Sequence, residues 1–316
     1  MPYPTEPSFL TRRRWLSLAA LPATGGFLGG CGTPMPLTAA APTNASAAAV
    51  QRLAASAEAH GLAAYRQITD INIAYAGQWR PLINRLQPEI VDEGFRGPSQ
   101  ERLMPSAGVV AQAYVGAKGK KQVFWQRSKA VAAEGLAQGQ SAVWFNDRAS
   151  QSAAELAAAS LVAECYGLFL LGPLWLASRQ ASGLAVPAEL AGTERVHGRS
   201  CDVVNVWLRP GFGHSASDRL SLFIDRDDHV TRRLRFTLEG FPGTRGAVAE
   251  VDCFEHARHF GLLLPMRSYE EVVHPLRLPA HDWFVTGLDV NRGYGVAALR
   301  GSQFSGAAAA QARALQ

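Results

Sequence analysis

Apolar and polar residues alternate along much of this sequence, and that alternation predicts β-strands with one buried face. It is clear in residues 69–79 and returns in residues 230–239, where Arg232 is the one polar residue on the apolar side. Further strand candidates recur in both halves, separated by turn residues. The predicted apolar faces of the two clearest segments consist of Ile71, Ile73, Tyr75, Trp79, Leu234, Phe236 and Leu238.

One segment breaks the strand pattern. Residues 152–171 are rich in alanine and long apolar side chains, and their only charged members are Glu155 and Glu164. Ser150 or Ser152 can cap a helix there, and the following Gly-Pro pair ends it. A helix that is apolar nearly all round is buried or covers something apolar. The sequence leaves two interpretations open, a core helix or a lid over an apolar cavity. The lid candidates are Leu161, Leu168 and Phe169.

Roughly ten strands joined by hairpin turns predict one large antiparallel sheet, curved enough to enclose apolar side chains on its concave face. A short helix near residues 48–61 is expected before the first strand, and a helical insert near 150–176 interrupts the strands. We therefore expect an α+β fold, an unclosed β-barrel covered by helices. Residues 50–300 are predicted to form it as a single domain, since no change in composition divides them.

The first thirty residues resemble a bacterial export signal. The adjacent Arg12 and Arg13 precede a short apolar run, which is similar to a twin-arginine signal peptide. The run spans residues 15–28 and contains proline and glycine, so it suits a signal peptide better than a membrane span. It ends in Leu-Gly-Gly-Cys31, which resembles a lipobox and implies that Cys31 is lipidated. A chance cysteine after an ordinary signal peptide is the alternative.

These features predict the organisation and location of the chain. Residues 1–30 are the predicted signal peptide, residues 31–49 a lipidated and flexible tether, and residues 301–316 a flexible tail. Gly32 rather than aspartate follows the predicted lipidated cysteine. By resemblance to the bacterial sorting rule, this favours the periplasmic face of the outer membrane. Without lipidation, the protein would be periplasmic.

Composition narrows the class of protein. The 316 residues are 47% hydrophobic and 18% charged, which is too apolar for a disordered chain. No run of 18 uninterrupted apolar residues occurs, and this excludes a protein with several membrane spans. The net charge of +5 falls to +3 without residues 1–30, and we expect no nucleic-acid partner. Arg233 and Arg235 share one face of a predicted strand, which we interpret as a solvated face.

No motif indicates catalysis, a metal or a cofactor. The sequence contains neither G-x-S-x-G nor a phosphate-binding loop, and its one glycine-rich turn joins strand to strand. His256 and His259 fall on opposite faces of a predicted strand, which is unsuitable for a shared metal ion. Cys165 is interpreted as a buried hydrophobic residue. Whether Cys201 and Cys253 form a disulfide stays open.

A resemblance to a known family rests on strand segments of the second half. Residues 218–225 and 232–240, with residues 254–256 followed by 261–266, are similar to a hairpin of the LolA/LolB-like lipoprotein-carrier superfamily. The resemblance implies an unclosed β-barrel, covered by helices, that holds acyl chains in a hydrophobic cavity. The chain departs from the small carriers by its long connection over residues 79–108 and its enlarged helical insert. It therefore looks like a divergent member with an unknown ligand.

The leading hypothesis is an exported lipoprotein that binds a lipid, an acyl chain or a lipoprotein as a carrier or sensor, without catalysis. An envelope assembly protein with a protein partner is the first alternative. A periplasmic enzyme with a cofactor, exported by the twin-arginine route, is the second. The sequence leaves open the ligand, the oligomeric state, and whether the apolar interior is a cavity or a solid core.

Overall fold

The computed structural model describes residues 35, 40–97, 99–128, 131–132, 135–136 and 139–302. The elements below all belong to the unit Thr33–Gln316. The predicted export signal with Arg12 and Arg13, the lipidation site Cys31 and the predicted tail beyond residue 302 lie outside the described residues.

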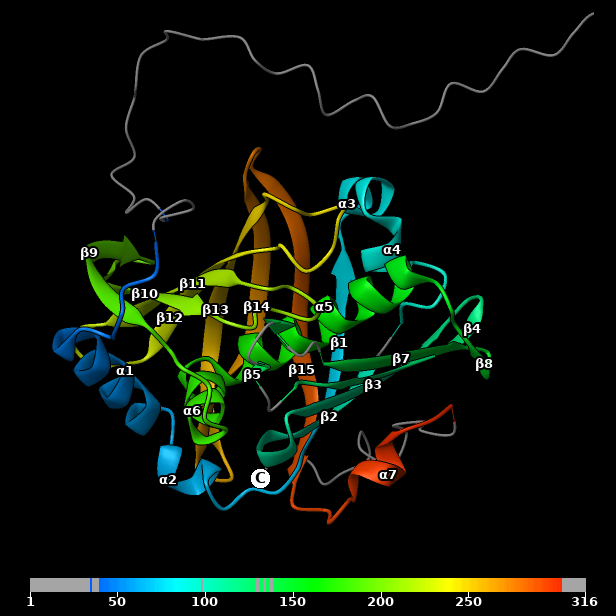
Figure 1. Cartoon of the computed structure of the whole chain (residues 1–316), viewed down its shortest axis with the longest axis horizontal. Helices are drawn as coiled ribbons and strands as arrows, with labels where there is room; N and C mark the ends of the chain where they lie inside the picture. The colour runs from blue at the N-terminus through cyan, green and yellow to red at the C-terminus, as the bar shows by residue number, and fades with distance from the viewer. Residues whose placement is uncertain are drawn as a thin grey trace, which may run out of the picture. The chain divides into compact units, whose positions relative to one another are not determined.

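Thirteen antiparallel strands form one sheet in the order β8-β7-β4-β3-β2-β1-β15-β14-β13-β12-β11-β10-β9 (Figure 1). β8 and β9 lie at its two edges and do not pair with each other, so the sheet formed by the described strands is not closed. This confirms the predicted fold class. The strands are β1 (Ile71–Trp79), β2 (Ser99–Met104), β3 (Val109–Gly116), β4 (Gly119–Gln126), β7 (Gln140–Phe145), β8 (Arg148–Ala149), β9 (Ala188–Val196), β10 (Arg199–Leu208), β11 (Asp218–Asp225), β12 (Thr231–Thr237), β13 (Val248–His259), β14 (Leu262–His274) and β15 (Leu278–Val290); β5 (Val131–Ala132) and β6 (Gly135–Leu136) form a separate pair.

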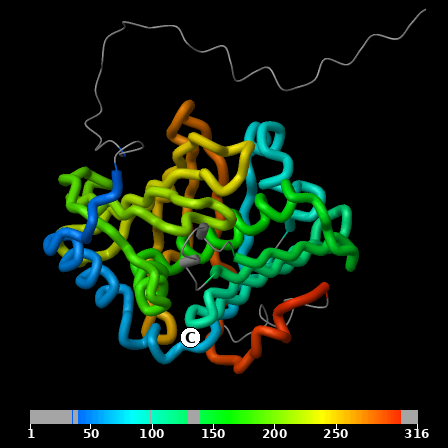
Figure 2. The backbone as a smooth tube through the Cα atoms, viewed as in Figure 1, coloured from blue at the N-terminus to red at the C-terminus, as the bar shows by residue number. Residues whose placement is uncertain are grey.

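The pairing of β1 with β15 joins the first and last strands of the chain at the middle of the sheet. Nearly all other neighbours in the sheet are also neighbours in sequence, which is the arrangement of successive hairpins. Figure 2 shows the first and last strands together: the cyan segment of β1 and the orange segment of β15 lie side by side near the centre. The helices are α1 (Ala47–Ala59), α2 (Leu62–Tyr65), α3 (Pro81–Leu86), α4 (Pro88–Val91), α5 (Ala153–Leu171), α6 (Pro173–Ala181) and α7 (Val296–Leu299), with a 3₁₀ turn at Pro105–Ala107.

The predicted apolar helix is α5, and it is a core helix. Ser152 caps its start by accepting a hydrogen bond from the backbone N–H of Glu155, and Gly172, in a left-handed conformation, ends it. Fourteen of its 19 residues are buried, and it contacts β3, β4, β7 and β14. Among the described helices, α5 is the one long and apolar enough to cross a membrane, but 78% of that apolar window is buried inside the domain.

The predicted apolar faces of β1 and β12 pack against this helix. Ile71, Ile73, Leu234 and Phe236 are fully buried in the main hydrophobic cluster, and Leu238 packs against it in part. The lid candidates Leu161, Leu168 and Phe169 are buried in the same cluster. The ring of Phe169 lies 5.3 Å from that of Phe236 and 5.1 Å from that of Trp283, between centroids. The concave face of the sheet is therefore filled where α5 covers it.

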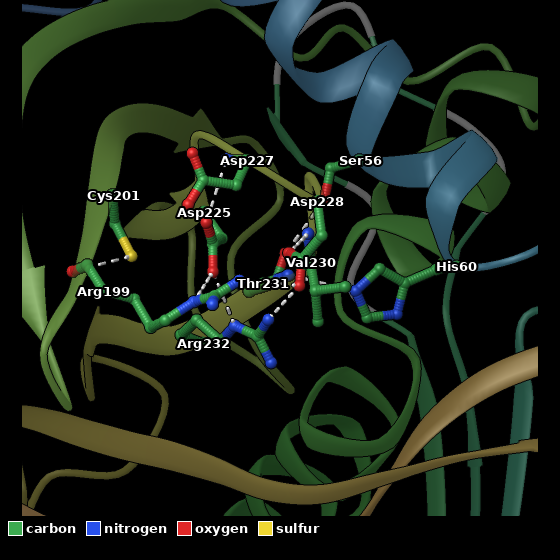
Figure 3. A network of polar contacts seen from close by, with 10 residues as sticks. All are labelled: Ser56, His60, Arg199, Cys201, Asp225, Asp227, Asp228, Val230, Thr231 and Arg232. Atoms are coloured by element: carbon green, nitrogen blue, oxygen red, sulfur yellow. Dashed lines mark hydrogen bonds and ion pairs between the residues drawn. The ribbon is translucent and has the colours of Figure 1, made fainter.

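Two predictions about the arginines of β12 are wrong. Phe223 pairs with Arg233 but its neighbour Ile224 pairs with Thr231, so Arg232 is the extra residue of a β-bulge and does not enter the core. Its Nε lies 3.1 Å from the Asp225 carboxylate instead (Figure 3). The face of Arg233 and Arg235 is also not a solvated one. Both arginines are ion-paired with Glu250, and Arg235 and Glu250 are buried.

The helix α1 is attached to the sheet by buried polar contacts. Ser56 Oγ lies 3.1 Å from Thr231 Oγ1, and the Thr231 backbone N–H donates to Nε2 of His60 (Figure 3). The Ser46 backbone N–H, just before the helix, donates to the carbonyl of Ala188 in the edge strand β9. Ala47–Ala49, within the predicted tether, therefore belong to the helix. These contacts position α1 beside α2 and α6, where a large cavity lies.

Candidate functional site

The larger cavity lies between α1, α2 and α6 and has a volume of about 560 Å³. We call it the apolar cavity. Its walls come from side chains of all three helices and of the segments next to them. The apolar residues that line it are Ala45, Val50, Leu53, Ala54, Ala57, Leu62, Tyr65, Ile68, Pro105, Pro173, Leu176, Ala177, Ala181 and Val186.

The apolar cavity opens to solvent along α1. Val50 lines it and is 50% exposed, and Ala54, one turn further along the same helix, is also exposed. Arg66, the residue after α2, lines the cavity with an exposed side chain. No carboxylate of the described residues lies within 4 Å of that guanidinium. The cavity thus combines an apolar interior with the positive charge of Arg66 at its opening.

The smaller cavity, of about 230 Å³, lies on the concave side of the sheet beside α5. We call it the aromatic pocket. β1 supplies Tyr75 and Trp79, and β15 supplies His281 and Trp283, which the pairing of the two strands brings together. Tyr166 of α5 closes one side. Further lining residues come from β2, β3 and the segment between β1 and β2, including Asn84, Glu93, Arg96, Ser99 and Tyr114.

Aromatic rings in this pocket are stacked nearly parallel. The Trp79 and His281 rings have centroids 4.4 Å apart and planes 9° apart, and Tyr166 and Trp283 are 5.7 Å and 6° apart. The Tyr166 hydroxyl lies 3.3 Å from Nδ1 of His281. Burial lowers the pKa of His281 well below its usual value, so the imidazole is neutral at neutral pH. The rings therefore form a flat-sided and uncharged wall.

Arg96 places a positive charge in the same pocket. Its Nε donates to the carbonyl of Val91 at 2.7 Å and its Nη2 to that of Ile90 at 3.1 Å. The guanidinium carbon lies 4.3 Å from the centroid of Tyr114 and 5.8 Å from that of Trp79. Each partner fixes the guanidinium without neutralising it, because backbone carbonyls and rings carry no net charge. No carboxylate of the described chain lies within 4 Å of Arg96.

Two carboxyl groups are buried under α5. Burial raises the pKa of Glu101 to about 8, although the Gln112 amide donates to its carboxylate. Burial also raises the pKa of Glu270 to about 8. Both groups are therefore mainly protonated at neutral pH, and they add little negative charge to the interior. Arg96 consequently remains the uncompensated charge of this region, since Lys121 is paired with Asp92.

A third polar cluster is structural. Glu164 of α5 lies 3.1 Å from Nε of Arg127 and 3.5 Å from Nη1 of Arg179, and it accepts the backbone N–H of Gly213 at 2.9 Å. Burial lowers the pKa of Arg179 to about 9. The cavity beside this cluster measures only about 20 Å³, which is too small for an organic ligand. These contacts join α5 to the β10–β11 loop.

The described residues offer little for catalysis. Ser141 Oγ lies 2.9 Å from Nε2 of His214, but Nδ1 of that histidine is buried without a partner. The pair thus lacks the third group that orients a catalytic histidine. No cluster of three or more metal-ligating side chains occurs among the described residues. Cys165, Cys201 and Cys253 are free and buried, so the open question of a disulfide is answered.

The predicted ligand-face residues divide between two environments. Tyr75 and Trp79 line the aromatic pocket. Ile71, Ile73, Leu234, Phe236 and Leu238 line none of the three cavities, and neither do the lid candidates. The residues of the apolar cavity were missed because they lie on short helices, whose mutual packing no local pattern shows. Arg96 was missed because its pocket joins segments that are far apart in sequence.

No family model and no curated protein matches the sequence. Among solved structures, a putative outer membrane lipoprotein-sorting protein domain from Vibrio parahaemolyticus is 7% identical, with 80% of this chain and 97% of that chain covered and a TM-score of 0.48. A DUF1329 family protein from Desulfovibrio piger is 10% identical, with 82% and 98% covered and a TM-score of 0.47.

A LolA superfamily protein from Nitrosomonas europaea is 9% identical, with 77% of this chain and 93% of that chain covered and a TM-score of 0.35. The chain is similar to these three structures over most of its length.

Proposed function

We propose that this protein is an exported, lipid-anchored envelope protein that binds the acyl chain of an anionic lipid in the apolar cavity, without catalysis. The observation that carries the proposal is the cavity of about 560 Å³ between α1, α2 and α6. Its volume is within the range of small-molecule sites, about 300–1,000 Å³, and its lining is mainly aliphatic. The ligand site thus lies beside the sheet edge and not beneath α5.

The driving force would be the removal of acyl surface from water. Each buried methylene contributes about 0.8 kcal/mol, so ten of them contribute on the order of 8 kcal/mol before the costs of association. Leu53, Leu62 and Leu176 supply large aliphatic walls, and Ala54, Ala57 and Ala177 leave the space between them. Small side chains at these positions are needed, because a larger residue on either helix would occupy the ligand's volume.

Arg66 favours a ligand with a negative headgroup. Its guanidinium lies at the opening of the apolar cavity without an ion-pair partner among the described residues. A carboxylate or phosphate headgroup would meet it there while the acyl chain enters the apolar interior. Because this contact is exposed to solvent, it would contribute about 0.2–1 kcal/mol. Arg66→Gln is therefore expected to weaken palmitate binding by no more than about five-fold and to leave hexadecanol binding unchanged.

The anchoring part of the proposal rests on the sequence. Arg12 and Arg13 would direct export, and lipidated Cys31 would hold the protein at the periplasmic face of the outer membrane. A single lipid-binding site on an anchored domain suits a carrier or sensor of lipids or acylated proteins. Metabolic labelling with a palmitate analogue tests the anchor, since Cys31→Ala would abolish labelling of the chain if Cys31 is the lipidated residue.

Native mass spectrometry tests the ligand site. The full chain carrying Cys31→Ala would be extracted free of lipid and titrated with palmitate. Ala177→Phe fills the apolar cavity from α6, and we expect it to weaken binding at least ten-fold. Ala48→Phe is the matched control, because Ala48 is exposed on α1 and does not line the cavity. No palmitate bound by the parent chain, or equal binding by both variants, would overturn the proposal.

A further inference from the structure

We infer that the aromatic pocket is a second binding site, and that it takes a small planar carboxylate of about the size of one aromatic ring. This inference does not depend on the lipid site, because the aromatic pocket and the apolar cavity share no lining residue. The volume of about 230 Å³ is below the usual range for drug-sized ligands, which limits the occupant to a small molecule.

The shape of the pocket favours a flat ligand. Trp79, His281, Tyr166 and Trp283 form a series of rings in which successive planes differ by 6° to 18°. Aromatic rings bind other rings in offset stacked or edge-to-face arrangements that contribute about 0.5–1.5 kcal/mol beyond surface burial. A planar ring can extend such a series, whereas a branched or saturated ring meets it at fewer points. The pocket is thus selective for planarity.

The charge of the pocket favours an anion. The guanidinium of Arg96 is held by two backbone carbonyls and lies over Tyr114. Its position close to both Tyr114 and Trp79 puts it at the level of the aromatic walls. A partly buried cation without a counter-charge costs free energy, and a ligand carboxylate would supply that charge through charge-assisted hydrogen bonds. The neutral His281 and the protonated Glu101 do not compete for that role.

Glu93 is the one carboxylate that lines this pocket. It is exposed at the rim and accepts a hydrogen bond from the Asn84 amide. Its repulsion of an anionic ligand is reduced by solvent, in contrast with the attraction at the less exposed Arg96. Glu93→Gln should therefore strengthen binding of a carboxylate about two-fold. A cationic ligand would give the opposite result with this variant.

The segment between β1 and β2 builds the site. Residues 80–97 contain α3 and α4 and place Asn84, Glu93 and Arg96 over the ends of β1 and β15. The Arg80 backbone N–H donates to the Ala280 carbonyl, which attaches the start of this segment to β15. This is the long connection by which the sequence departs from the small carriers. In this chain, the long connection therefore supplies the charged side chains of the aromatic pocket.

Calorimetric titration of the full chain carrying Cys31→Ala tests the inference with four probes. Benzoate should bind at one saturable site. Benzamide, which is neutral, should bind at least ten-fold more weakly than benzoate. Cyclohexanecarboxylate, which is not planar, should bind about three-fold more weakly than benzoate. Decanoate distinguishes a fatty-acid headgroup from a free ring acid. If decanoate competes with benzoate and binds more tightly, the planar-ring assignment is wrong.

Two variants and a control locate the site. Arg96→Gln should weaken benzoate binding at least ten-fold, and Arg85→Gln, an exposed arginine of the same segment that does not line the pocket, should change it less than two-fold. Ser99→Phe, at the position of β2 that pairs with Tyr75, fills the pocket without touching the charge and should abolish binding if Arg96→Gln fails to fold. Absence of saturable benzoate binding, or binding unchanged by both pocket variants, would overturn the inference.

Discussion

The Thr231 backbone N–H donates a 3.1 Å hydrogen bond to Nε2 of His60, and this bond joins the helix that lines the apolar cavity to strand β12 of the sheet. Nδ1 of the same imidazole lies 2.8 Å from the Leu263 carbonyl, which can only accept. Nδ1 therefore carries the proton and Nε2 is the acceptor. The bond to Thr231 requires a neutral imidazole, since a protonated ring has no acceptor.

This bond makes the stability of the protein sensitive to acid. Burial lowers the pKa of His60 to about 4, with smaller contributions from His256, Arg232 and Arg258. An unfolded chain has a histidine pKa near 6.5, so it binds the proton more readily than the native protein does. Above pH 6.5 the imidazole of His60 is neutral in both the native and the unfolded chain, so it does not change the stability with pH there. Between pH 6.5 and 4, stability falls progressively, by about 3 kcal/mol for this group.

We expect His60→Gln to reduce the dependence of stability on pH between 4 and 7, and to lower stability at pH 7 by about 1–2 kcal/mol through its altered hydrogen bonds. Urea unfolding followed by circular dichroism at several pH values measures both effects. His274→Gln, at an exposed position, serves as the control. A pH dependence that is the same in His60→Gln and the parent chain would show that another group is responsible.

Glu164 provides a second test, because it balances Arg127 and Arg179 inside the domain. Glu164→Ala would leave the fully buried Arg179 without its carboxylate and the Gly213 N–H without its acceptor. Removing one partner of a buried ion pair typically costs about 3–5 kcal/mol. Thermal unfolding should therefore show a large decrease in Tm. Glu58→Ala, on the exposed side of α1, should change stability by less than about 0.5 kcal/mol.

The sequence predicted those parts of the fold that a local pattern determines. The strand over residues 71–79 and the caps of α5 at Ser152 and Gly172 follow from short-range features, and the structure confirms them, although Asn72 on the second face of the strand is buried as well. The bulge at Arg232 could not be predicted, because it depends on the pairing of β12 with β11. When the alternation is continued through the extra residue of a bulge, each residue before the bulge is assigned to the opposite face of the strand.

The sites depend on longer-range packing still. Trp79 and His281 are about two hundred positions apart in the chain and become neighbours only because β1 pairs with β15. The apolar cavity is formed by three helices whose mutual angles follow from contacts such as His60 with Thr231. A pattern of apolar residues is the same for a filled core and for a cavity wall, so the sequence could not separate Phe236 from Leu53. Only the packing separates them.

That difference between core and wall can be measured with Phe236→Ala. Phe236 is fully buried and packs against Phe169 and Phe212, and it lines none of the three cavities. We expect the substitution to destabilise the domain by about 3–5 kcal/mol. Palmitate affinity of the folded protein should stay within two-fold of the parent chain. A large loss of affinity with unchanged stability would instead make Phe236 part of a ligand site, as the sequence pattern allowed.

The buried cysteines give a last prediction. Burial raises the pKa of Cys253 to about 12 and that of Cys201 to about 11, so neither thiol forms appreciable thiolate at pH 8. Cys165 is buried in α5. In the native state of the chain carrying Cys31→Ala, iodoacetamide should therefore modify none of the three at the rate of a free thiol. In urea without reductant, all three should react, as mass spectrometry would show. If only one reacts there and three react after reduction, a disulfide is present and the free state of these cysteines is wrong.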